Sequence, residues 1–95
     1  MIKIKDIVAD TFTNASGYGL YLAIVNKLDN STDIINLSFE GVSGTSSSFL
    51  NSSLGTLIDE RGIDVLKKIK PTNVGATQAE ILKKYIASAS KLVKI

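Results

Sequence analysis

The sequence predicts a small α/β protein in which strands and helices alternate in the order βαβαβα, with a mostly parallel sheet covered by helices. Residues 33–39 form a nearly continuous apolar run, which is typical of a central strand covered on both sides or flanked by parallel neighbours. Residues 46–61 and 77–93 carry apolar residues at helical spacing. At 95 residues and 44% hydrophobic content, the chain is expected to form one domain over residues 1–95.

The amino-terminal segment predicts an edge strand followed by a helix. Isoleucines alternate with lysines over residues 2–8, which indicates a half-exposed strand near the edge of the sheet. A helix is expected from about Ser16 to residues 29–31, with apolar residues at positions 20, 21, 24, 25 and 28. Gly17 and Gly19 lie in its first turn. A loose helix entry is the favoured interpretation, and a close approach of backbone or ligand is the alternative.

The central strand, residues 33–39, is expected to leave the sheet through a turn at Gly41 and to enter a second helix over residues 46–61. Gly62 supplies the residue of positive φ that ends this helix. Gly55 lies inside it, which predicts that the helix backbone packs closely against the sheet. The expected buried stripe consists of Phe49, Leu50, Leu54, Leu57 and Ile58.

The carboxyl-terminal third predicts a final strand and helix. Residues 63–66 form either a turn of helix or the start of a strand, and Pro71 is expected at an edge or strand end. Thr77 and Glu80 match a capping box at the start of the third helix. The apolar face expected for that helix consists of Ile81, Leu82, Tyr85, Ile86, Ala89, Leu92 and Val93.

Composition restricts the chemistry. The chain has no cysteine and no histidine, which removes the thiol nucleophile, the commonest general base and the commonest metal ligands. Six of its nine carboxylates are candidates for such chemistry, and they show no spacing that pairs them with a base or a metal. We therefore expect a protein that is not an enzyme and that holds no metal ion and no cofactor. The carboxylates considered are Asp6, Asp10, Glu40, Asp59, Glu60 and Asp64.

Charge and hydropathy narrow the class of partner. The net charge is +2 and the only arginine is Arg61, so a nucleic-acid partner is not expected. The lysines of the carboxyl-terminal third alternate with apolar residues and are interpreted as solvated faces of a strand and a helix. No segment has the length of a membrane span or the pattern of a signal peptide, so a cytoplasmic location is expected. These lysines are Lys67, Lys68, Lys70, Lys83, Lys84, Lys91 and Lys94.

A cluster of hydroxyls opens the second predicted helix, at Thr45, Ser46, Ser47 and Ser48. Together with free backbone N–H groups at the carboxyl end of a sheet, such a cluster suits an anion or a phosphoryl group. Capping alone explains one of the hydroxyls, because an N-cap needs one oxygen to accept from the first helical N–H groups. Four hydroxyls in succession exceed that need, and the sequence leaves a structural and a functional interpretation open.

The order and spacing of several segments resemble the STAS-like family of small bacterial domains and, more distantly, the anti-anti-sigma factors. The segments that carry the resemblance are a short amino-terminal strand, a loop that contains Phe12, and residues 35–42, 46–50, 54–55 and 60–62. In anti-anti-sigma factors the second helix opens with an Asp-Ser-Ser-Gly motif, whose first serine is phosphorylated by a kinase of the histidine-kinase-like ATPase class. In this chain Ser46 stands in the place of the Asp, and Phe49 in that of the Gly.

The resemblance implies a non-catalytic regulatory module that binds a protein partner, such as a histidine-kinase-like ATPase or another regulator. Ser47 stands at the phosphorylated position and Ser48 at the next serine, so Ser46, Ser47 and Ser48 are the candidate site for phosphorylation and partner binding. The alternative function is a small inhibitor or adaptor of mobile-element or phage type that blocks a larger machine. The oligomeric state is not predicted. The candidate partner-binding loops contain Asn14, Ser16, Gly17, Gly19, Glu40, Ser43 and Thr45.

Overall fold

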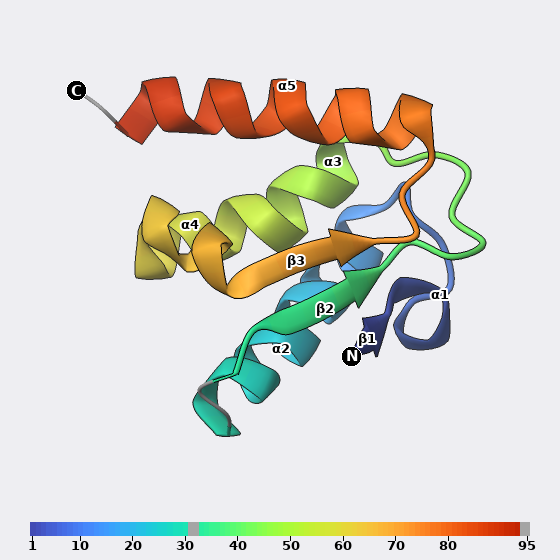
Figure 1. The fold of residues 1–95 in the computed structure, drawn as a ribbon, viewed down its shortest axis with the longest axis horizontal. Coiled ribbons are helices and arrows are strands. Elements are labelled where there is room, and N and C mark those ends of the chain that lie inside the picture. The colour runs from blue at the N-terminus through green and yellow to red at the C-terminus, as the bar shows by residue number, and fades with distance from the viewer. Residues whose placement is uncertain (31–32, 94–95) are drawn as a thin grey trace.

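A computed structural model shows a small α/β protein built on one parallel sheet of three strands (Figure 1). The structure describes residues 1–30 and 33–93, and within the last helix the side chains as far as residue 88. The strands lie in the order β1 (Ile2–Lys3), β2 (Ile35–Ser38), β3 (Ile69–Thr72). β2 is therefore central and has a parallel neighbour on each side, as the sequence predicts.

The described residues also form seven helical elements. They reproduce the predicted order βαβαβα once adjoining helices are counted together. The elements are α1 (Ile4–Ile7), α2 (Asn14–Asn30), α3 (Ser47–Leu50), the π-helical turn η1 (Asn51–Gly55), α4 (Thr56–Arg61), the 3-10 helix η2 (Ile63–Lys68) and α5 (Ala76–Val93).

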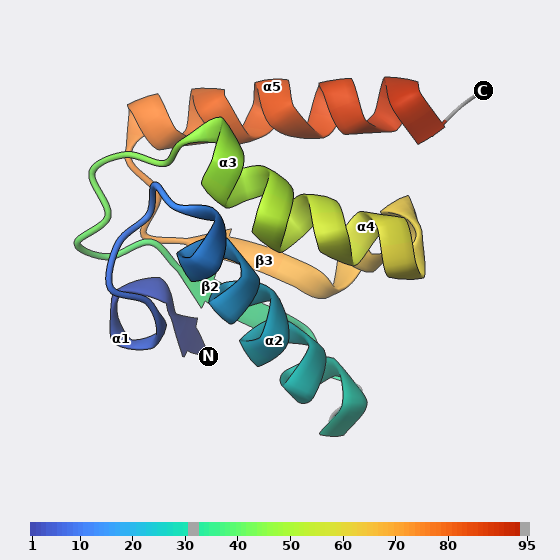
Figure 2. The ribbon, with the colours of Figure 1, turned by 180° about the vertical axis from the view of Figure 1, so that it is seen from behind.

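The long helices lie on one side of the sheet. Figures 1 and 2 show α2 and the continuous α3–η1–α4 segment behind β2 and β3, with α5 alongside this helical layer. Successive side chains of a strand point to opposite faces, and the covered face carries Ile2, Ile35 and Leu37. On the other face Asn36 and Lys70 are exposed. The alternative that β2 is flanked by parallel strands is thus confirmed, while on its second face Asn36 is exposed and Ser38 is buried.

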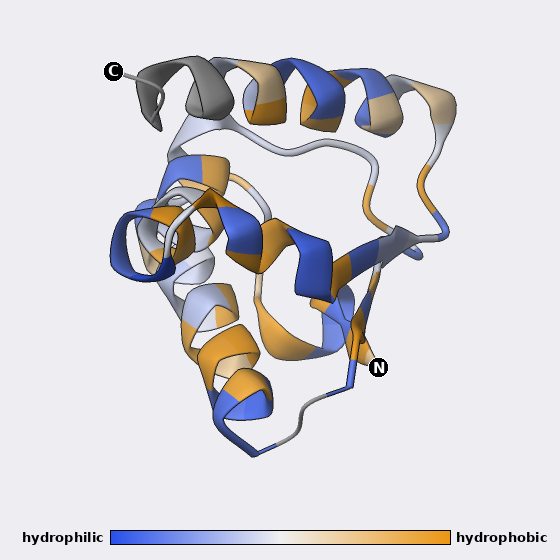
Figure 3. Ribbon diagram, turned by 60° about the vertical axis from the view of Figure 1, so that its left-hand side comes forward, coloured by the Kyte–Doolittle hydropathy of each residue, from blue (hydrophilic) through white to orange (hydrophobic). Residues whose placement is uncertain are grey.

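The core lies between this sheet face and the helices. All five residues of the stripe predicted for the second helix are buried. Figure 3 shows apolar residues, in orange, along the helices and strands that enclose this core. A cavity of about 50 Å³ remains under α5. Its lining consists of Leu37, Phe39, Leu54, Leu66, Ile69, Pro71, Leu82 and Ile86.

The first strand is shorter than the sequence predicts. β1 ends at Lys3, and residues 4–7 form a single helical turn closed by the Val8 N–H, which donates to the Ile4 carbonyl at 3.1 Å. Isoleucines at positions 4 and 7 also satisfy helical spacing, so the pattern suits both structures. The burial of Ile4, which is fully enclosed, favours the turn. The predicted place at the sheet edge is confirmed.

The second helix begins and ends as predicted but contains a π-helical turn. The Thr56 N–H donates to the Asn51 carbonyl, five residues earlier, and the Ser53 hydroxyl donates to the Phe49 carbonyl at 2.8 Å. Such back-bonding by serine competes with the regular helical ladder. The close packing predicted at Gly55 is confirmed, but the predicted neighbour is wrong, since a Cβ there would lie 2.6 Å from the Tyr85 hydroxyl of α5 rather than against the sheet.

Two glycine and proline positions in the second half agree with the sequence. Gly62 has a φ of +85° and ends α4, after which residues 63–68 form the 3-10 helix η2. Pro71 lies in the edge strand β3. Its neighbour Thr72 accepts from the Phe39 N–H at 2.9 Å, and alternate residues of a parallel strand bond to opposite sides, so the missing N–H of Pro71 faces away from β2.

The capping box predicted for the last helix does not form. α5 begins at Ala76, one residue before Thr77, and its first turn is closed by the Ala79 N–H donating to the Gly75 carbonyl at 2.9 Å. Thr77 and Glu80 are exposed, whereas Gln78 between them is buried. Leu82 of the predicted apolar face is buried, and positions 89, 92 and 93 lie outside the described side chains.

Candidate functional site

The predicted hydroxyl cluster lies where the loops after the strands gather, at the carboxyl end of the sheet (Figure 1). The loop of residues 39–46 joins β2 to α3, and residues 8–13 and 73–75 precede α2 and α5. In α/β proteins this edge is where ligands and partners usually bind. The predicted location of the candidate site therefore agrees with the topology.

Ser46 is the N-cap of α3. Its hydroxyl accepts from the Phe49 N–H at 3.0 Å and donates to the Phe12 carbonyl at 2.6 Å. Its own N–H donates to the Thr11 carbonyl at 3.1 Å. Both hydrogen-bonding functions of the Ser46 side chain are thus used internally, and this serine has the structural role that capping predicts.

Ser47 and Ser48 differ from Ser46 in their surroundings. Both side chains are exposed, and neither hydroxyl makes a hydrogen bond with another residue in the described part of the chain. They occupy the first two helical positions, where backbone N–H groups give the helix end a partial positive charge. An acceptor group added to either hydroxyl would meet this positive end.

Phe12 lies beside Ser46, whose hydroxyl donates to its carbonyl, and the sequence alone assigns it no role in the site. Its side chain is 58% exposed. A Cβ on Gly44 would lie 3.9 Å from the Phe12 ring and 3.9 Å from the Gln78 amide nitrogen. We define the serine surface as Phe12, Gly44, Ser47 and Ser48. It combines one apolar anchor with two free hydroxyls.

A turn at Asp10 presents Phe12. The Asp10 carboxylate accepts from the backbone N–H groups of Phe12 and Thr13, each at 2.9 Å, and these bonds hold the pKa of Asp10 below its ordinary value of 3.8. Thr13 in turn caps α2, because its hydroxyl accepts from the Ser16 N–H at 3.2 Å. The polar residues between β1 and α2 therefore form an ordered turn.

The Asp10 turn gives a testable acid dependence. Because the folded pKa is lowered, the turn contributes its stability fully above the ordinary pKa of 3.8 and loses it as the pH falls through the folded value. NMR titration of the Asp10 carboxyl carbon should give a midpoint below 3.8 in the folded protein and near 3.8 in urea. Equal midpoints in the two states would contradict the turn.

Gly17 is a packing residue and not part of a ligand loop. A Cβ at this position would lie 2.5 Å from the Phe49 carbonyl oxygen and 2.8 Å from the Ser52 Cβ. The close approach of a backbone is thus the correct interpretation of this glycine, and the loose helix entry is wrong. Gly19 has no such neighbour, since the nearest atom is the Val8 Cγ1 at 3.9 Å.

The other candidate residues are engaged within the protein. Asn14 accepts from the Ser52 hydroxyl at 3.0 Å, and the Ser16 N–H is bonded to Thr13. Glu40 pairs with Lys3 of β1 at 2.7 Å, which lowers the pKa of Glu40 and raises that of Lys3. The structure therefore does not bring Glu40, Asn14 and Ser16 together with the free hydroxyls as one reactive group.

Thr45 and Ser43 contact a second residue that the sequence analysis did not select. Gln78 of α5 accepts from the Thr45 hydroxyl at 3.1 Å and donates to the Ser43 carbonyl at 3.3 Å. Its only signal in the sequence is its place inside the presumed capping box. Phe12 likewise has a weak signal, as one apolar residue in a polar stretch without periodicity.

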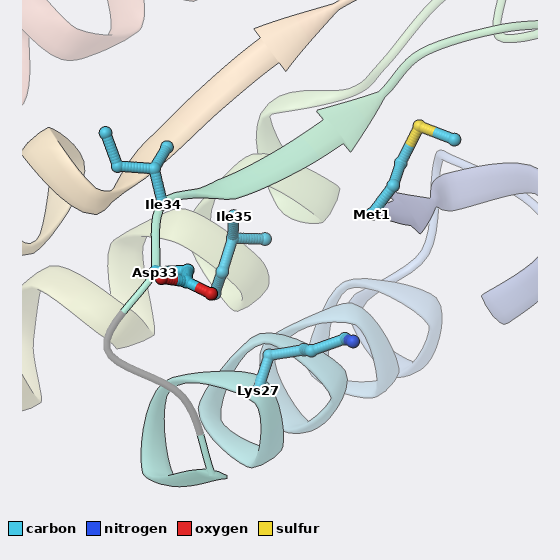
Figure 4. A pocket seen from close by; sticks show the side chains of 5 residues that line it. All are labelled: Met1, Lys27, Asp33, Ile34 and Ile35. Carbon is cyan, nitrogen blue, oxygen red and sulfur yellow. The ribbon is translucent and has the colours of Figure 1, made fainter.

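A pocket at the amino end of β2 differs in chemistry from the serine surface. Figure 4 shows a shallow pocket of about 170 Å³ at the amino end of β2, lined by Met1, Lys27, Asp33, Ile34 and Ile35. Its lining has one ammonium and one carboxylate, and no group suited to nucleophilic chemistry. In the described residues no three carboxylate, thiol or imidazole side chains could hold a metal ion.

Over the described ranges, none of the helices combines the length and apolar character needed to cross a bilayer.

Comparison with known proteins identifies a family. The model of the STAS-like domain of unknown function (DUF4325) matches residues 16–79, which include most of α2, all of β2 and β3, and the serine surface except Phe12. No curated protein and no solved structure matches the sequence. The matched region covers well over half of the chain and agrees with the parallel α/β fold. The protein belongs to the family of STAS-like domains of unknown function.

Proposed function

We propose that this protein is a non-catalytic regulatory module that binds a protein partner through the serine surface, and that phosphorylation of Ser47 switches the binding. The observation that carries the proposal is the contrast between neighbouring serines. Ser46 uses its hydroxyl both to cap α3 and to bond the Phe12 carbonyl, whereas Ser47, the next residue, is exposed and its hydroxyl makes no hydrogen bond within the described residues. A kinase can reach Ser47 without unfolding α3.

The position of Ser47 supports a switch that leaves the fold intact. A phosphoryl group adds a charge of roughly −1.5 to −2 at neutral pH. At the first position of α3 this charge would face the positive end of the helix, so the folded state should tolerate it. A partner packed against Phe12 and Ser47 would have to desolvate the same charge, and its affinity should fall.

The proposed partner is a kinase of the histidine-kinase-like ATPase class, acting in the cytoplasm of a bacterium, with neither membrane nor nucleic acid involved. The support is chemical. The chain has no histidine or cysteine and cannot supply the usual catalytic groups itself, so the phosphoryl transfer requires an enzyme that holds ATP. The serine surface contains no lysine or arginine with which to attract a phosphate backbone.

Substitutions in the serine cluster test the proposal. Ser47→Ala and Ser47→Asp should each unfold within about 1 kcal/mol of the parent, because neither removes the cap. Ser46→Ala, the matched control, should lose about 1 kcal/mol or more, because it removes the cap of α3. Denaturant unfolding measures these differences. In calorimetric titration with the candidate ATPase, Ser47→Asp should bind far more weakly than Ser47→Ala.

Mass spectrometry after incubation with the candidate ATPase and ATP locates the modified residue. Phosphate on Ser47 supports the switch. Unmodified protein, or equal binding by Ser47→Asp and the parent, would contradict it.

A small inhibitor or adaptor of mobile-element or phage type is the second candidate, and a separate surface favours it. Tyr18 and Leu22, one helical turn apart on α2, are 51% and 49% exposed. Neither belongs to the serine surface. If Leu22→Lys abolished binding to a captured partner while Ser47→Asp did not, the adaptor function would replace the phosphorylation switch.

A further inference from the structure

Gln78 is a buried polar residue at the beginning of α5. It is 2% exposed, although it lies between two exposed residues of the first helical turns. Its amide nitrogen donates to the Ser43 carbonyl at 3.3 Å, and its amide oxygen accepts from the Thr45 hydroxyl at 3.1 Å. A buried amide with both functions satisfied fixes the direction of the groups it contacts. Gln78 therefore fixes the loop that leads into α3.

The same loop is held on its other side by the segment before α2. The Thr11 hydroxyl donates to the Gly44 carbonyl, and the Thr11 carbonyl accepts from the Ser46 N–H at 3.1 Å. The Ser46 hydroxyl donates to the Phe12 carbonyl at 2.6 Å. Residues 43–46 thus lie between α5 and the segment of residues 11–12. Each of the four makes a hydrogen bond to Gln78 of α5 or to that segment.

Gln78 also provides a link that the rest of α5 lacks. Within the side chains that the structure describes, its two bonds are the only hydrogen bonds from α5 side chains to other elements. The remaining contacts of the helix are apolar, through Leu82 and the partly buried Ile81, Tyr85 and Ile86. Apolar contacts are non-directional and leave the exact position of a helix less defined than paired amide bonds do.

We infer that Gln78 is a positioning residue for the serine surface, and that through it the docking of α5 is coupled to the placement of Phe12 and Ser47. The inference concerns the free protein, and it rests on the proposed function only for what the surface binds. Coupling is reciprocal, so a partner that binds the ordered surface must also stabilise docked α5. Displacement of α5 must in turn weaken the surface.

Hydrogen exchange in the free protein tests the coupling. Gln78→Met keeps the length and burial of the side chain but removes both hydrogen bonds. The amides of Ser46 and Phe49, which are bonded to Thr11 and Ser46, should exchange about fivefold faster or more. Amides of β2 should change less, which separates local loosening from global destabilisation.

Two further variants keep this test decisive. Thr45→Val removes one of the Gln78 bonds from the loop side and should raise exchange at Ser46 in the same direction. Glu80→Gln is the control, because Glu80 is exposed and lies two residues after Gln78 on α5. It should leave hydrogen exchange at the Ser46 and Phe49 amides unchanged. Parent-like exchange in both Gln78→Met and Thr45→Val would overturn the inference. Equal acceleration at every amide would overturn it as well.

A second arm separates this inference from the proposed function. If the candidate ATPase binds the parent, it should bind Gln78→Met more weakly and Glu80→Gln equally well. If the ATPase does not bind the parent, the proposed function fails, and the exchange result in the free protein still stands or falls by itself.

Discussion

Replacement of Gly17 by alanine is expected to destabilise the protein by about 3 kcal/mol, the upper end of the usual cost of overpacking. The added methyl group would lie 2.5 Å from the Phe49 carbonyl oxygen and 2.8 Å from the Ser52 Cβ. The first of these atoms belongs to the backbone of α3 and cannot move away without displacing the helix. Exchange of glycine for alanine inside a helix otherwise stabilises it, so the expected loss has the opposite sign to helix propensity.

Gly19 is the matched control for this change. A Cβ there would meet only the Val8 Cγ1 at 3.9 Å, which is an ordinary contact distance. Gly19→Ala is therefore expected to stabilise the protein by up to about 1 kcal/mol. Urea unfolding of both variants measures the two changes in the free energy of unfolding. If the two variants shifted stability in the same direction, the close packing of α2 against α3 would be wrong.

The Gly17 contact also bears on the candidate site. α2 carries Phe12 on the turn before it, and α3 carries Ser47 at its start, so the spacing of these helices sets the shape of the serine surface. Two polar contacts also join α2 to α4, which continues the helical segment that begins with α3. The Tyr21 hydroxyl donates to Glu60, which raises the pKa of Tyr21 to about 12, and Arg61 pairs with Asp29 at 2.9 Å.

The elements that the sequence predicts well are those whose burial is periodic. The stripe from Phe49 to Ile58 follows the helical period, and the central strand buries Ile35, Leu37 and Phe39 at the strand period. Residues 2–7 were predicted less well, because isoleucines at 2, 4 and 7 satisfy both periods over so short a segment. The π-helical turn at 51–55 depends on Ser53 bonding back to Phe49, which the hydrophobic period does not reveal.

In the candidate site, too, the sequence predicts the local features and misses those that depend on distant contacts. The start of α3 was predicted, because a hydroxyl cluster after a strand and a glycine is a local signal. The roles of Phe12 and Gln78 depend on contacts across more than thirty positions of the chain, such as Ser46 with Phe12 and Thr45 with Gln78. Neither of these contacts is local in the sequence, so no periodicity or cap motif reveals it.

Phe49 occupies the position of the glycine in the motif that anti-anti-sigma factors carry, and the structure places its side chain in the core. It is 1% exposed and belongs to the hydrophobic core, so it does not face a partner that approaches Ser47. The serine surface is therefore bounded by Phe12 and not by Phe49. The substitution relative to the motif changes the packing beneath the helix rather than the access to its first turn.

Two matched phenylalanine substitutions test this distinction. Phe49→Ala is expected to lower the free energy of unfolding by about 3–5 kcal/mol, because it removes a buried aromatic ring and leaves a cavity. That is a large fraction of the roughly 5–15 kcal/mol that a small protein has. Phe12→Ala, at an exposed position, should change stability by no more than about 0.5 kcal/mol.

Binding should follow the opposite order. At temperatures where both variants remain folded, Phe12→Ala should weaken binding to the candidate ATPase more than Phe49→Ala does. The reason is that aromatic anchors carry much of the binding energy of protein interfaces. Urea unfolding and calorimetric titration measure the two quantities on the same samples. Equal losses of stability in both variants would show that Phe12 belongs to the core, and the serine surface would then lack its apolar anchor.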